Sequence, residues 1–493
     1  MSMKKFYFFV LFLSVVVNMP AQIDSRDYPY WNDIVTEQPN GYCIGIDGNI
    51  EISSPEGLAW LSNMVNGYNG CEPHSFEGRK IQLITNLPMY GDTCRMRFKP
   101  IGNRDHPFMG EFDGKGYSID KLSLCESGED KTDLGLFGYL YHAVVRNLVL
   151  NDEALYLDPY HKNPDGRSWF SGGVAGISDS LSIVDNCMVA SIDGFLAADV
   201  VGGVIGMNRN SILKNCAYFS ENLLIVPDGG GGGVVGMNVS EGDVFDAIVS
   251  NCCFVGEVMP GYTDDFGGIV CYNETAVNNI EKVACVSNCY ALSGINLTYA
   301  FSGDGFRSFG NEGSIAAVNS QKSMIYNCYG KALSGSHYQL YEVNEGETGN
   351  CIGFETNGVS CVLDAPVIIN EMETADLLEA LNYWIAGQEN PSQYRRWKYG
   401  VNGLPEYDDP DYDIPETDGL SSASILYPNP TSGTVHIEGE SIAEIKVYNT
   451  LGQLMKTVQN TNEIDLKGLP KGLYVVKIVD ENGFVATDNV VLE

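Results

Sequence analysis

The chain has few basic residues for its length. Lysine and arginine together number 29 against 64 aspartates and glutamates, so the formal net charge of the 493 residues is −35. Proteins that bind nucleic acid carry basic patches, and electrostatic docking on anionic lipid also requires positive charge. The composition therefore excludes nucleic acid as a partner and argues against attachment to a membrane surface by charge.

Recognisable catalytic and metal-binding motifs are also missing from the sequence. The six histidines form no His-Glu-x-x-His pattern, and no Gly-x-Ser-x-Gly elbow occurs. Cys285 and Cys289 have near-ligand spacing, but no second pair completes a zinc site. The glycine run Gly229–Gly233 lacks the following helix and the Lys-Ser or Lys-Thr pair of a phosphate-binding loop. We therefore predict no cofactor and no metal, and the sequence identifies no catalytic residue.

Long hydrophobic runs are absent beyond the first residues of the chain. Two lysines precede the apolar run Phe6–Val17, and a small-residue cleavage site follows, with the cut between Ala21 and Gln22. A membrane-spanning helix needs about 20 apolar residues, so this run is too short to be one. Residues 1–21 are therefore predicted to be a secretory signal peptide, and no transmembrane segment is predicted.

What the sequence does contain is a repeat across residues 171–329. Its first half is a glycine pair, apolar residues and usually another glycine, as in Gly172–Gly176, Gly202–Gly206 and Gly232–Gly236. Its second half is an apolar strand ending in Asn-Cys, with asparagines 29 to 39 residues apart at Asn186, Asn215, Asn251, Asn288 and Asn327. A recurring period of this length signals stacked units that cannot bury their own apolar faces alone.

The repeat units have the character of strands. Short apolar runs such as Ile183-Val184 and Ile248-Val249 are bounded by Gly, Asn, Asp and Ser, and no helical apolar period continues through the block. Stacked coils place equivalent residues about 4.8 Å apart. We therefore predict an all-β, parallel β-helix solenoid in which the asparagine amides bond to one another along the stack. The glycine pairs would form corners that need positive φ or a close backbone approach.

The repeats are similar to a known motif when the preceding segments are included. Together with Phe98–Gly102, Pro107–Gly116 and Gly135–Gly138, they resemble the GLUG-motif repeat of bacterial surface proteins over about residues 45–405. The resemblance implies a right-handed β-helix located at the cell surface, and it does not imply one shared activity.

Helical segments flank the repeats and are predicted to cap both ends of the solenoid. In residues 45–67, Ser54 is a suitable helix N-cap. In residues 365–407, Thr374 can begin a second helix. An uncapped stack would expose apolar side chains and sheet edges. The β-helix domain with its two caps is therefore predicted to span residues 22–407.

Residues 408–421 are predicted to be an acidic linker. Asp409, Asp411 and Asp413 alternate as in a calcium loop, but Ile414 and Leu420 stand where an EF-hand needs Gly and Glu. We therefore interpret the segment as a solvated connection.

Residues 422–493 form a separate small domain. Turns rich in Gly, Asn and Pro separate alternating segments that are typical of an Ig-like β-sandwich. The strands are predicted at Thr434–Ile437, Glu444–Tyr448, Leu473–Ile478 and Phe484–Val491.

Three segments of this domain, Leu426–Pro430, Val447–Gly452 and Gly468–Tyr474, resemble the type A C-terminal sorting domain of the type IX secretion system of Bacteroidetes. The resemblance implies the secretion machinery as a partner. It also implies a protein that is secreted or attached to the outer surface after the signal peptide and the sorting domain are removed.

Two groups can be recognised among the 14 cysteines. Those of the Asn-Cys pairs should stack on one inward face, where Cβ atoms about 4.8 Å apart are wider than a disulfide prefers, so we predict buried thiols. Cys71 with Cys94, and Cys351 with Cys361, lie outside this column and are the predicted disulfides of an exported chain.

A long insertion at Leu155–Phe170 carries aromatic residues that we predict as a ligand-contact loop: Tyr156, Tyr160, Trp169 and Phe170. Such rings can stack on sugars, and ordinary loop packing is the alternative. The sequence favours a non-catalytic, adhesin-like protein that binds glycan or a host surface protein. The alternative is a polysaccharide lyase or glycoside hydrolase, in which carboxylates from solenoid loops would converge beside an Arg, Lys or Tyr.

Overall fold

The structure is a computed structural model of the chain. It describes residues 29–46, 48–89, 96–126, 133–151, 154–157, 169–191, 195–196, 199–225, 230–260, 265–295, 312–333, 341–349, 351–353, 374–399, 405–408, 426–427, 431, 433–437, 442–449, 454–480 and 485–492. The predicted signal peptide, with Ala21 and Gln22, lies outside these residues.

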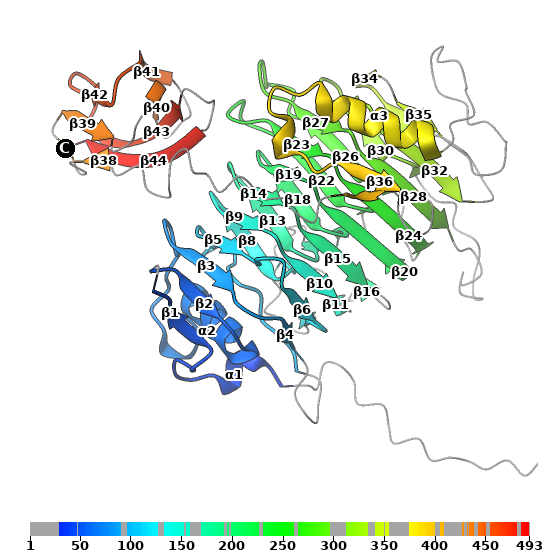
Figure 1. Ribbon diagram of the computed structural model, residues 1–493, viewed down its shortest axis with the longest axis horizontal. Helices are drawn as coiled ribbons and strands as arrows, with labels where there is room; N and C mark the ends of the chain where they lie inside the picture. The colour runs from blue at the N-terminus through cyan, green and yellow to red at the C-terminus, as the bar shows by residue number, and fades with distance from the viewer. Residues whose placement is uncertain are drawn as a thin grey trace, which may run out of the picture.

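Most of the described chain is the predicted parallel β-helix (Figure 1). A complete coil contributes one strand to each of four sheets, which we call the first to fourth walls in chain order. One such coil consists of β12 (Phe170–Gly172), β13 (Ala175–Asp179), β14 (Ile183–Asp185) and β15 (Met188–Ser191). Each of these strands pairs in parallel with its equivalent in the next coil, which confirms the predicted fold class.

Each wall continues through the neighbouring coils. The first wall also contains β17 (Val200–Gly202), β21 (Gly230–Gly232), β25 (Phe266–Gly267) and β29 (Glu312–Gly313). The second wall also contains β8 (Phe137–Tyr141), β18 (Ile205–Arg209), β22 (Val235–Ser240), β26 (Val270–Thr275), β30 (Ala316–Asn319) and β33 (Tyr341–Asn344).

The third wall also contains β1 (Tyr42–Ile44), β2 (Ile50–Ile52), β3 (Lys80–Leu83), β5 (Glu111–Asp113), β9 (Val144–Arg146), β19 (Ile212–Lys214), β23 (Ala247–Ser250), β27 (Ala284–Ser287), β31 (Met324–Tyr326) and β34 (Glu347–Gly349). The fourth wall also contains β4 (Leu87–Pro88), β6 (Ser118–Asp120), β10 (Val149–Asn151), β16 (Phe195–Leu196), β20 (Ala217–Ile225), β24 (Cys253–Pro260), β28 (Tyr290–Ile295), β32 (Tyr329–Leu333) and β35 (Ile352–Gly353). Beside it, β7 (Ser123–Glu126) pairs with β11 (Ala154–Leu157).

The repeated asparagine forms the corner between the third and fourth walls. These asparagines have left-handed backbones with φ between 52° and 54°, a conformation that asparagine tolerates better than most residues. Asn251 Nδ2 donates to Asn215 Oδ1 at 2.8 Å, and Asn288 Nδ2 donates to Asn251 Oδ1 at 2.7 Å. The predicted asparagine ladder is therefore confirmed.

The ladder is interrupted at one rung. Asn215 Nδ2 donates to Asp185 Oδ1 at 2.7 Å instead of reaching Asn186. The side-chain oxygen of Asn186 accepts from Arg395 Nη1 at 2.9 Å. Arg395, which is far away in the sequence, therefore provides the hydrogen bond that the Asn186 side chain does not receive from the next rung.

A second asparagine ladder, which the sequence analysis did not predict, lies inside the second wall. Each side-chain amide donates to the next rung at 2.8 or 2.9 Å. Four members are fully buried, Asn208, Asn238, Asn273 and Asn319, and the last rung, Asn344, is exposed. These amides donate toward the C-terminal end of the stack, whereas those of the corner ladder donate toward the N-terminal end.

The glycine pairs form a sharp crease between the first and second walls. They do so by close backbone approach, and the alternative of positive φ does not apply to them. A Cβ atom at Gly202, Gly232 or Gly267 would lie 2.0, 1.8 or 1.7 Å from the carbonyl oxygen three residues ahead. No side chain fits at these distances, so glycine is required at these positions for steric reasons.

The predicted N-terminal cap is present as a helix and a hairpin. Ser54 Oγ accepts from Gly57 N at 3.2 Å, and α2 (Pro55–Asn66) ends at Gly67, whose φ is 75°. The helix lies at the N-terminal end of the stack (Figure 1), and its apolar side chains belong to the solenoid core. The strand predicted at Ile44–Ile52 is instead divided between β1 and β2, which pair antiparallel, and Gly45 N donates to Asn49 O at 2.8 Å between them.

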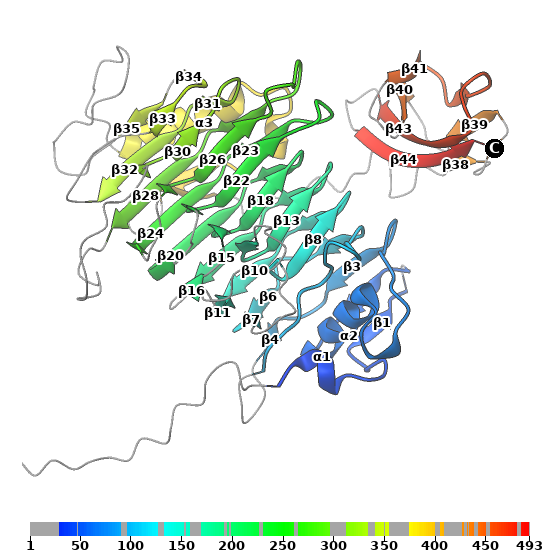
Figure 2. The ribbon, with the colours of Figure 1, turned by 180° about the vertical axis from the view of Figure 1, so that it is seen from behind.

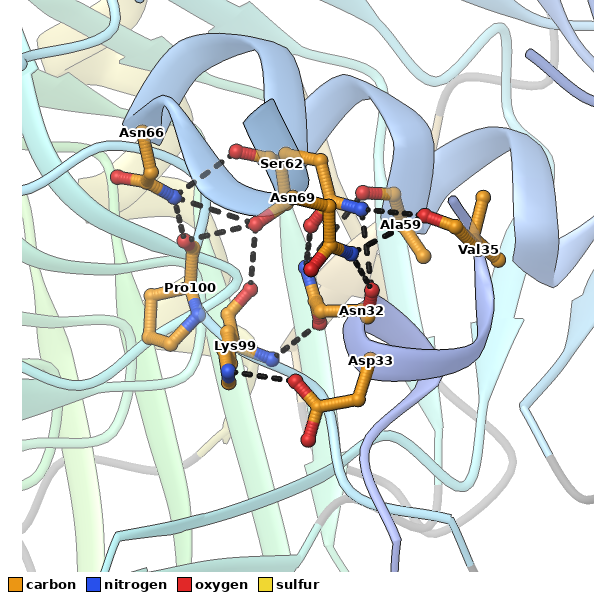
Figure 3. Close-up of polar contacts among 10 residues, drawn as sticks. Asn32, Asp33, Val35, Ala59, Ser62, Asn66, Asn69, Lys99 and Pro100 are labelled. Atoms are coloured by element: carbon orange, nitrogen blue, oxygen red, sulfur yellow. Dashed lines mark hydrogen bonds and ion pairs between the residues drawn. The ribbon is translucent and has the colours of Figure 1, made fainter. Parts of the chain in front are cut away.

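Buried amides join this cap to the first coil (Figure 3). Asn32, on the short helix α1 (Trp31–Ile34), donates to Asn63 Oδ1 at 3.0 Å and accepts from Lys99 N at 2.8 Å. Asn66 Nδ2 donates to Pro100 O at 2.8 Å. The cap is therefore fixed by directional bonds as well as by apolar contact.

The C-terminal helical segment lies on the flank of the solenoid, which corrects the predicted end cap. We call this segment the strap: α3 (Thr374–Ala386), η4 (Pro391–Gln393), β36 (Trp397–Tyr399) and β37 (Pro405–Tyr407). Its Leu377, Leu381 and Trp397 pack with Tyr290 and Tyr329 on the outer face of the fourth wall. Figures 1 and 2 show α3 on the side away from the second wall.

The strap also covers the asparagine corner. Arg395 N donates to Asn215 Oδ1 at 3.0 Å, and Asn251 Nδ2 donates to Arg395 O at 3.0 Å. Trp397 Nε1 donates to Asn251 Oδ1 at 2.7 Å. The strap is therefore bonded to the middle of the ladder, where it shields the amides from water.

The C-terminal domain has its own core and two antiparallel sheets. One sheet contains β38 (Leu426–Tyr427), β39 (Thr434–Ile437) and β42 (Glu463–Asp465); the other contains β40 (Ile442–Asn449), β41 (Leu454–Gln459), β43 (Gly472–Asp480) and β44 (Val485–Leu492). The four predicted strands correspond to β39, β40, β43 and β44, and β41 and β42 had not been predicted as strands.

Replacing a crease glycine should destabilise the solenoid. Gly232→Ala places a Cβ 1.8 Å from Val235 O, so we expect the free energy of unfolding to fall by at least about 2 kcal/mol. Denaturant unfolding followed by far-UV circular dichroism measures the change. Gly387→Ala is the control, because its Cβ would lie 3.4 Å from the nearest atom. Equal midpoints for the two variants would contradict the steric account.

Removing one ladder amide should lower the free energy of unfolding by more than the change in backbone preference alone explains. Asn251→Gly keeps the left-handed backbone but removes the partner of Asn215, Asn288 and Trp397, so we expect a loss of about 3 kcal/mol. Lys121→Gly, at an exposed residue with φ of 61°, controls for the backbone. A loss no larger than that of the control would show that the ladder does not stabilise the fold.

Candidate functional site

The structure separates the residues of the predicted ligand-contact loop. Trp169 and Phe170 begin the first wall, where Trp169 is partly exposed and Phe170 is 7% exposed. Tyr156 belongs to β11, which pairs with β7. Tyr160 lies outside the described residues. The candidate site described below therefore consists of the residues around Trp169 and Phe170.

An apolar row runs along the outer face of the second wall beside Phe170. Ile177, Met207 and Met237 occupy equivalent positions in β13, β18 and β22, and we call these three residues the apolar row. With Phe170 and Val200 they form a cluster distinct from the main core. The crease makes this possible, because it turns the outer faces of the first and second walls toward each other.

Arg104 lies beside Trp169 and is held by a buried carboxylate. Its Nε and Nη2 donate to the two oxygens of Asp133 at 2.7 and 2.8 Å, and its Cζ lies 5.3 Å from the centre of the Trp169 ring. The Asp133 side chain is 1% exposed and also accepts from Phe170 N at 3.1 Å. Gly176 allows this approach, since a Cβ there would lie 2.6 Å from Asp133 Cβ.

A second arginine is held in a similar way on the second wall. Arg209 Nη2 donates to Asp179 Oδ2 at 2.5 Å and to Tyr139 OH at 2.9 Å. Tyr139 OH donates to the same Asp179 oxygen at 2.5 Å, and Arg209 Nη1 lies 3.2 Å from Glu241 Oε1. Four side chains from different coils therefore meet on one exposed face.

The local charges fix the protonation states of these groups. Burial raises the pKa of Asp133, and the hydrogen bond to Asp133 raises the pKa of Arg104. Burial opposes the charge of Arg209, but its bond to Asp179 raises the Arg209 pKa above the ordinary value. Burial and the charge of Asp179 raise the pKa of Tyr139. Both arginines therefore stay charged, and Tyr139 stays neutral.

The two groups are close enough to influence each other, because the charge of Arg209 acts on Arg104. We call their residues the arginine cluster: Arg104, Asp133, Tyr139, Trp169, Asp179 and Arg209. The arginine side chains are 29% and 31% exposed, above carboxylates that are 1% and 6% exposed. The arrangement presents oriented N–H donors next to aromatic rings, which is suited to holding a polar ligand.

Sequence reasoning found Trp169 and missed the other members of the arginine cluster. Arg104, Asp133 and Tyr139 precede the regular repeats, so no pattern connected them to Trp169. A signal did exist for Asp179 and Arg209, which each follow the third glycine of a repeat by three residues. Aligning the two repeats would have placed opposite charges on adjacent rungs.

A separate column of charges lies on the third wall, and its members pair with one another. Arg146 Nη2 lies 2.6 Å from Glu111 Oε1, Lys80 Nζ lies 3.3 Å from the same oxygen, and Lys214 Nζ lies 3.5 Å from Asp185 Oδ2. Signs alternate from rung to rung along the wall. We interpret this column as a structural ladder.

The cysteines of the Asn-Cys pairs form the predicted column of buried thiols. Each is at most 1% exposed, and Cys216, Cys252 and Cys289 donate from Sγ to the carbonyl two residues before at 3.0 to 3.1 Å. Burial raises the pKa of the Cys216 and Cys252 thiols, which keeps them protonated.

Cys351 continues this column, so its predicted position outside the column is wrong. Its Sγ lies 3.5 Å from Ile325 O and 3.4 Å from Gly349 O, inside the core. Cys94 and Cys361 lie outside the described residues, and the disulfides Cys71–Cys94 and Cys351–Cys361 stay predictions. Among the described residues, no group of three or more His, Cys, Asp or Glu side chains is placed to hold a metal.

Comparison with known proteins identifies the end of the chain. Residues 425–493 match the family described as Secretion system C-terminal sorting domain. The C-terminal domain is a type IX secretion sorting domain. This domain implies secretion and surface attachment of the protein in a member of the Bacteroidetes. No helix in the described part of the chain is long and apolar enough to cross a membrane. The resemblance to GLUG repeats stays a prediction.

The solved structures that are similar to the chain include two of low identity, and no curated protein matches it. One is a candidate immunoglobulin A1 protease from Bacteroides ovatus, with 18% identity, a TM-score of 0.47, and coverage of 74% of this chain and 93% of that one. The other is an IgA1 protease with 14% identity and a TM-score of 0.34, and the likeness covers 88% of this chain and 34% of that one. Likenesses this distant carry no inference about activity.

The column thiols should be protected from alkylation in the folded protein. We expect iodoacetamide to modify the exposed Cys43 rapidly and to spare Cys187, Cys216, Cys252, Cys289 and Cys328 until denaturant is added. Peptide mass mapping of the alkylated native and unfolded protein measures this, with Cys43 as the internal control. A disulfide between adjacent column cysteines, or equal modification rates, would contradict the buried-thiol interpretation.

Proposed function

We propose that this exported protein is a non-catalytic binding protein that holds a glycan at the arginine cluster. The observation that carries the proposal is that the Trp169 ring lies beside Arg104, while Tyr139 bonds to Arg209 on the second wall. Aromatic faces and arginine donors are the groups that sugar rings and hydroxyls require. Type IX secretion brings the protein to the surface, where such ligands occur.

The rigidity of the cluster supports binding. Asp133 and Asp179 lie beneath the arginines and fix each guanidinium by hydrogen bonds of 2.5 to 2.8 Å. Asp179 and Arg209 lie on strands of a stack held by two asparagine ladders. A preorganised site loses little conformational entropy when the ligand binds.

Glycan cleavage is the second candidate, because Asp179 and Glu241 do converge on Arg209 and Tyr139. The chemistry of these groups favours binding. A general acid or base works best with a pKa near the operating pH, whereas the pKa values of Tyr139 and Arg209 are both shifted further from neutrality. Asp179 is engaged at both oxygens, by Ser180 Oγ at 3.0 Å and by Tyr139 and Arg209.

The test is retention of labelled polysaccharides and host surface proteins by the chain from Gln22 to Glu493, with polysaccharide size measured before and after. We expect one or more glycans to be retained at unchanged length, and Trp169→Ala to weaken that retention about tenfold because ring contact is lost. Tyr383→Ala removes an exposed aromatic residue on the strap and is the matched control.

Shortened polysaccharide would overturn the non-catalytic proposal in favour of the lyase or hydrolase. Retention of a host protein alone would overturn glycan as the ligand class. Thermal melting of each variant checks that the substitutions leave the solenoid folded.

A further inference from the structure

The arginine cluster contains two positive charges, yet it is not a cationic site. Arg104 faces Asp133, and Arg209 faces both Asp179 and Glu241. Asp199 lies at the edge of the cluster, where its Oδ2 accepts from Trp169 N at 2.8 Å. Two arginines therefore stand among four carboxylates, on a chain whose formal net charge is −35.

We propose that the ligand is an uncharged, hydroxyl-rich polysaccharide, and that the arginine cluster discriminates against acidic glycans. This inference rests on the proposed glycan-binding function and specifies its ligand. An incoming carboxylate or sulfate would meet guanidinium groups that are already neutralised and would be repelled by the acids around them. A hydroxyl group carries no such penalty, since it can both donate to a carboxylate and accept from an arginine.

The position of Trp169 favours the same class of ligand. Its indole Nε1–H is buried without an acceptor among the described residues. An unsatisfied buried donor destabilises the free protein, and a ligand hydroxyl oxygen can accept from it after a small rotation of the ring. The ring face itself stacks on the C–H surface of a sugar, and that contact does not depend on charge.

The apolar row indicates the direction in which an extended ligand would lie. Ile177, Met207 and Met237 follow one another on successive rungs about 4.8 Å apart, and Tyr272 holds the next position in register. Met207 and Met237 are partly exposed, and methionine adapts its shape to irregular surfaces. A linear chain lying along the solenoid axis would therefore contact the arginine cluster with one part and the apolar row with the next.

Glu241 allows the charge argument to be tested without disturbing the fold. Its side chain is 50% exposed, and its carboxylate pairs with Arg209 at 3.2 Å. Glu241→Gln removes one negative charge from the edge of the cluster. We expect this variant to raise the ratio of acidic-glycan binding to neutral-glycan binding about two- to fivefold over that of the parent chain. Glu281→Gln, an exposed acid elsewhere on the solenoid, is the matched control.

The experiment uses the chain from Gln22 to Glu493 and two sets of immobilised polysaccharides. The neutral set is a β-glucan, a galactomannan and a xylan, and the acidic set is polygalacturonate, hyaluronate and chondroitin sulfate. Retention is measured at about 0.05 M and about 0.5 M salt, which screens exposed charges strongly at the higher concentration. We expect retention by at least one neutral polysaccharide, with little change between the two salt concentrations.

The outcomes distinguish the class of ligand, the glycan-binding function and the location of the site. Salt-sensitive retention by the acidic set alone would overturn the neutral-ligand inference and leave the proposed glycan-binding function standing. Retention by neither set, with capture of host surface proteins instead, would overturn both. Retention by the neutral set that is unaffected by Trp169→Ala would show that the ligand binds elsewhere and would overturn the assignment to the arginine cluster.

Discussion

The fold depends on a corner that only a few residue types can form. Where the chain passes from the third to the fourth wall, one residue must adopt a left-handed backbone inside a stack from which water is excluded. Asparagine tolerates that backbone, and its amide can donate and accept along the stack axis. The same residue at every rung therefore solves the backbone problem and the hydrogen-bond problem together. The second ladder, in the second wall, donates in the opposite direction, so the amide dipoles of the two ladders oppose each other.

The site arises because the stack places residues that differ between successive repeats side by side. Residues in equivalent positions of successive coils become neighbours, so a substitution in one repeat faces the original residue in the next. Asp179 opposite Arg209 is such a pair, and Ile177, Met207 and Met237 are such a row. Regular repeats supply the rigid sheet, while departures from the repeat supply the chemistry. The arginine cluster lies where the regular repeats meet the less regular first coils, because Arg104 and Asp133 come from the latter.

The strap assigns different roles to the two sides of the solenoid. On the fourth wall its aromatic side chains cover Tyr290 and Tyr329, and its backbone completes the asparagine corner. The second wall lies on the opposite side, without the strap (Figure 2). The strap thus adds a long-range constraint to a solenoid whose strands pair between adjacent coils, and it ties residues near position 395 to a rung near position 215. A stack of this kind can open locally at its ends, and such a tie opposes opening in its middle.

The sequence by itself determined the solenoid, the helix after Ser54, the buried cysteines, the acidic surface and the sorting domain. These features depend on local sequence motifs, and a local motif has the same physical cause wherever it occurs. Only the tertiary structure decided that the glycine pairs act by close approach, that the strap lies on a flank, and that Cys351 joins the thiol column. It alone brought Arg104 and Asp133 to Trp169, because contacts between residues far apart in the chain depend on how many residues each coil contains. Insertions make that number irregular, so the register that assembles the site is fixed by packing in three dimensions.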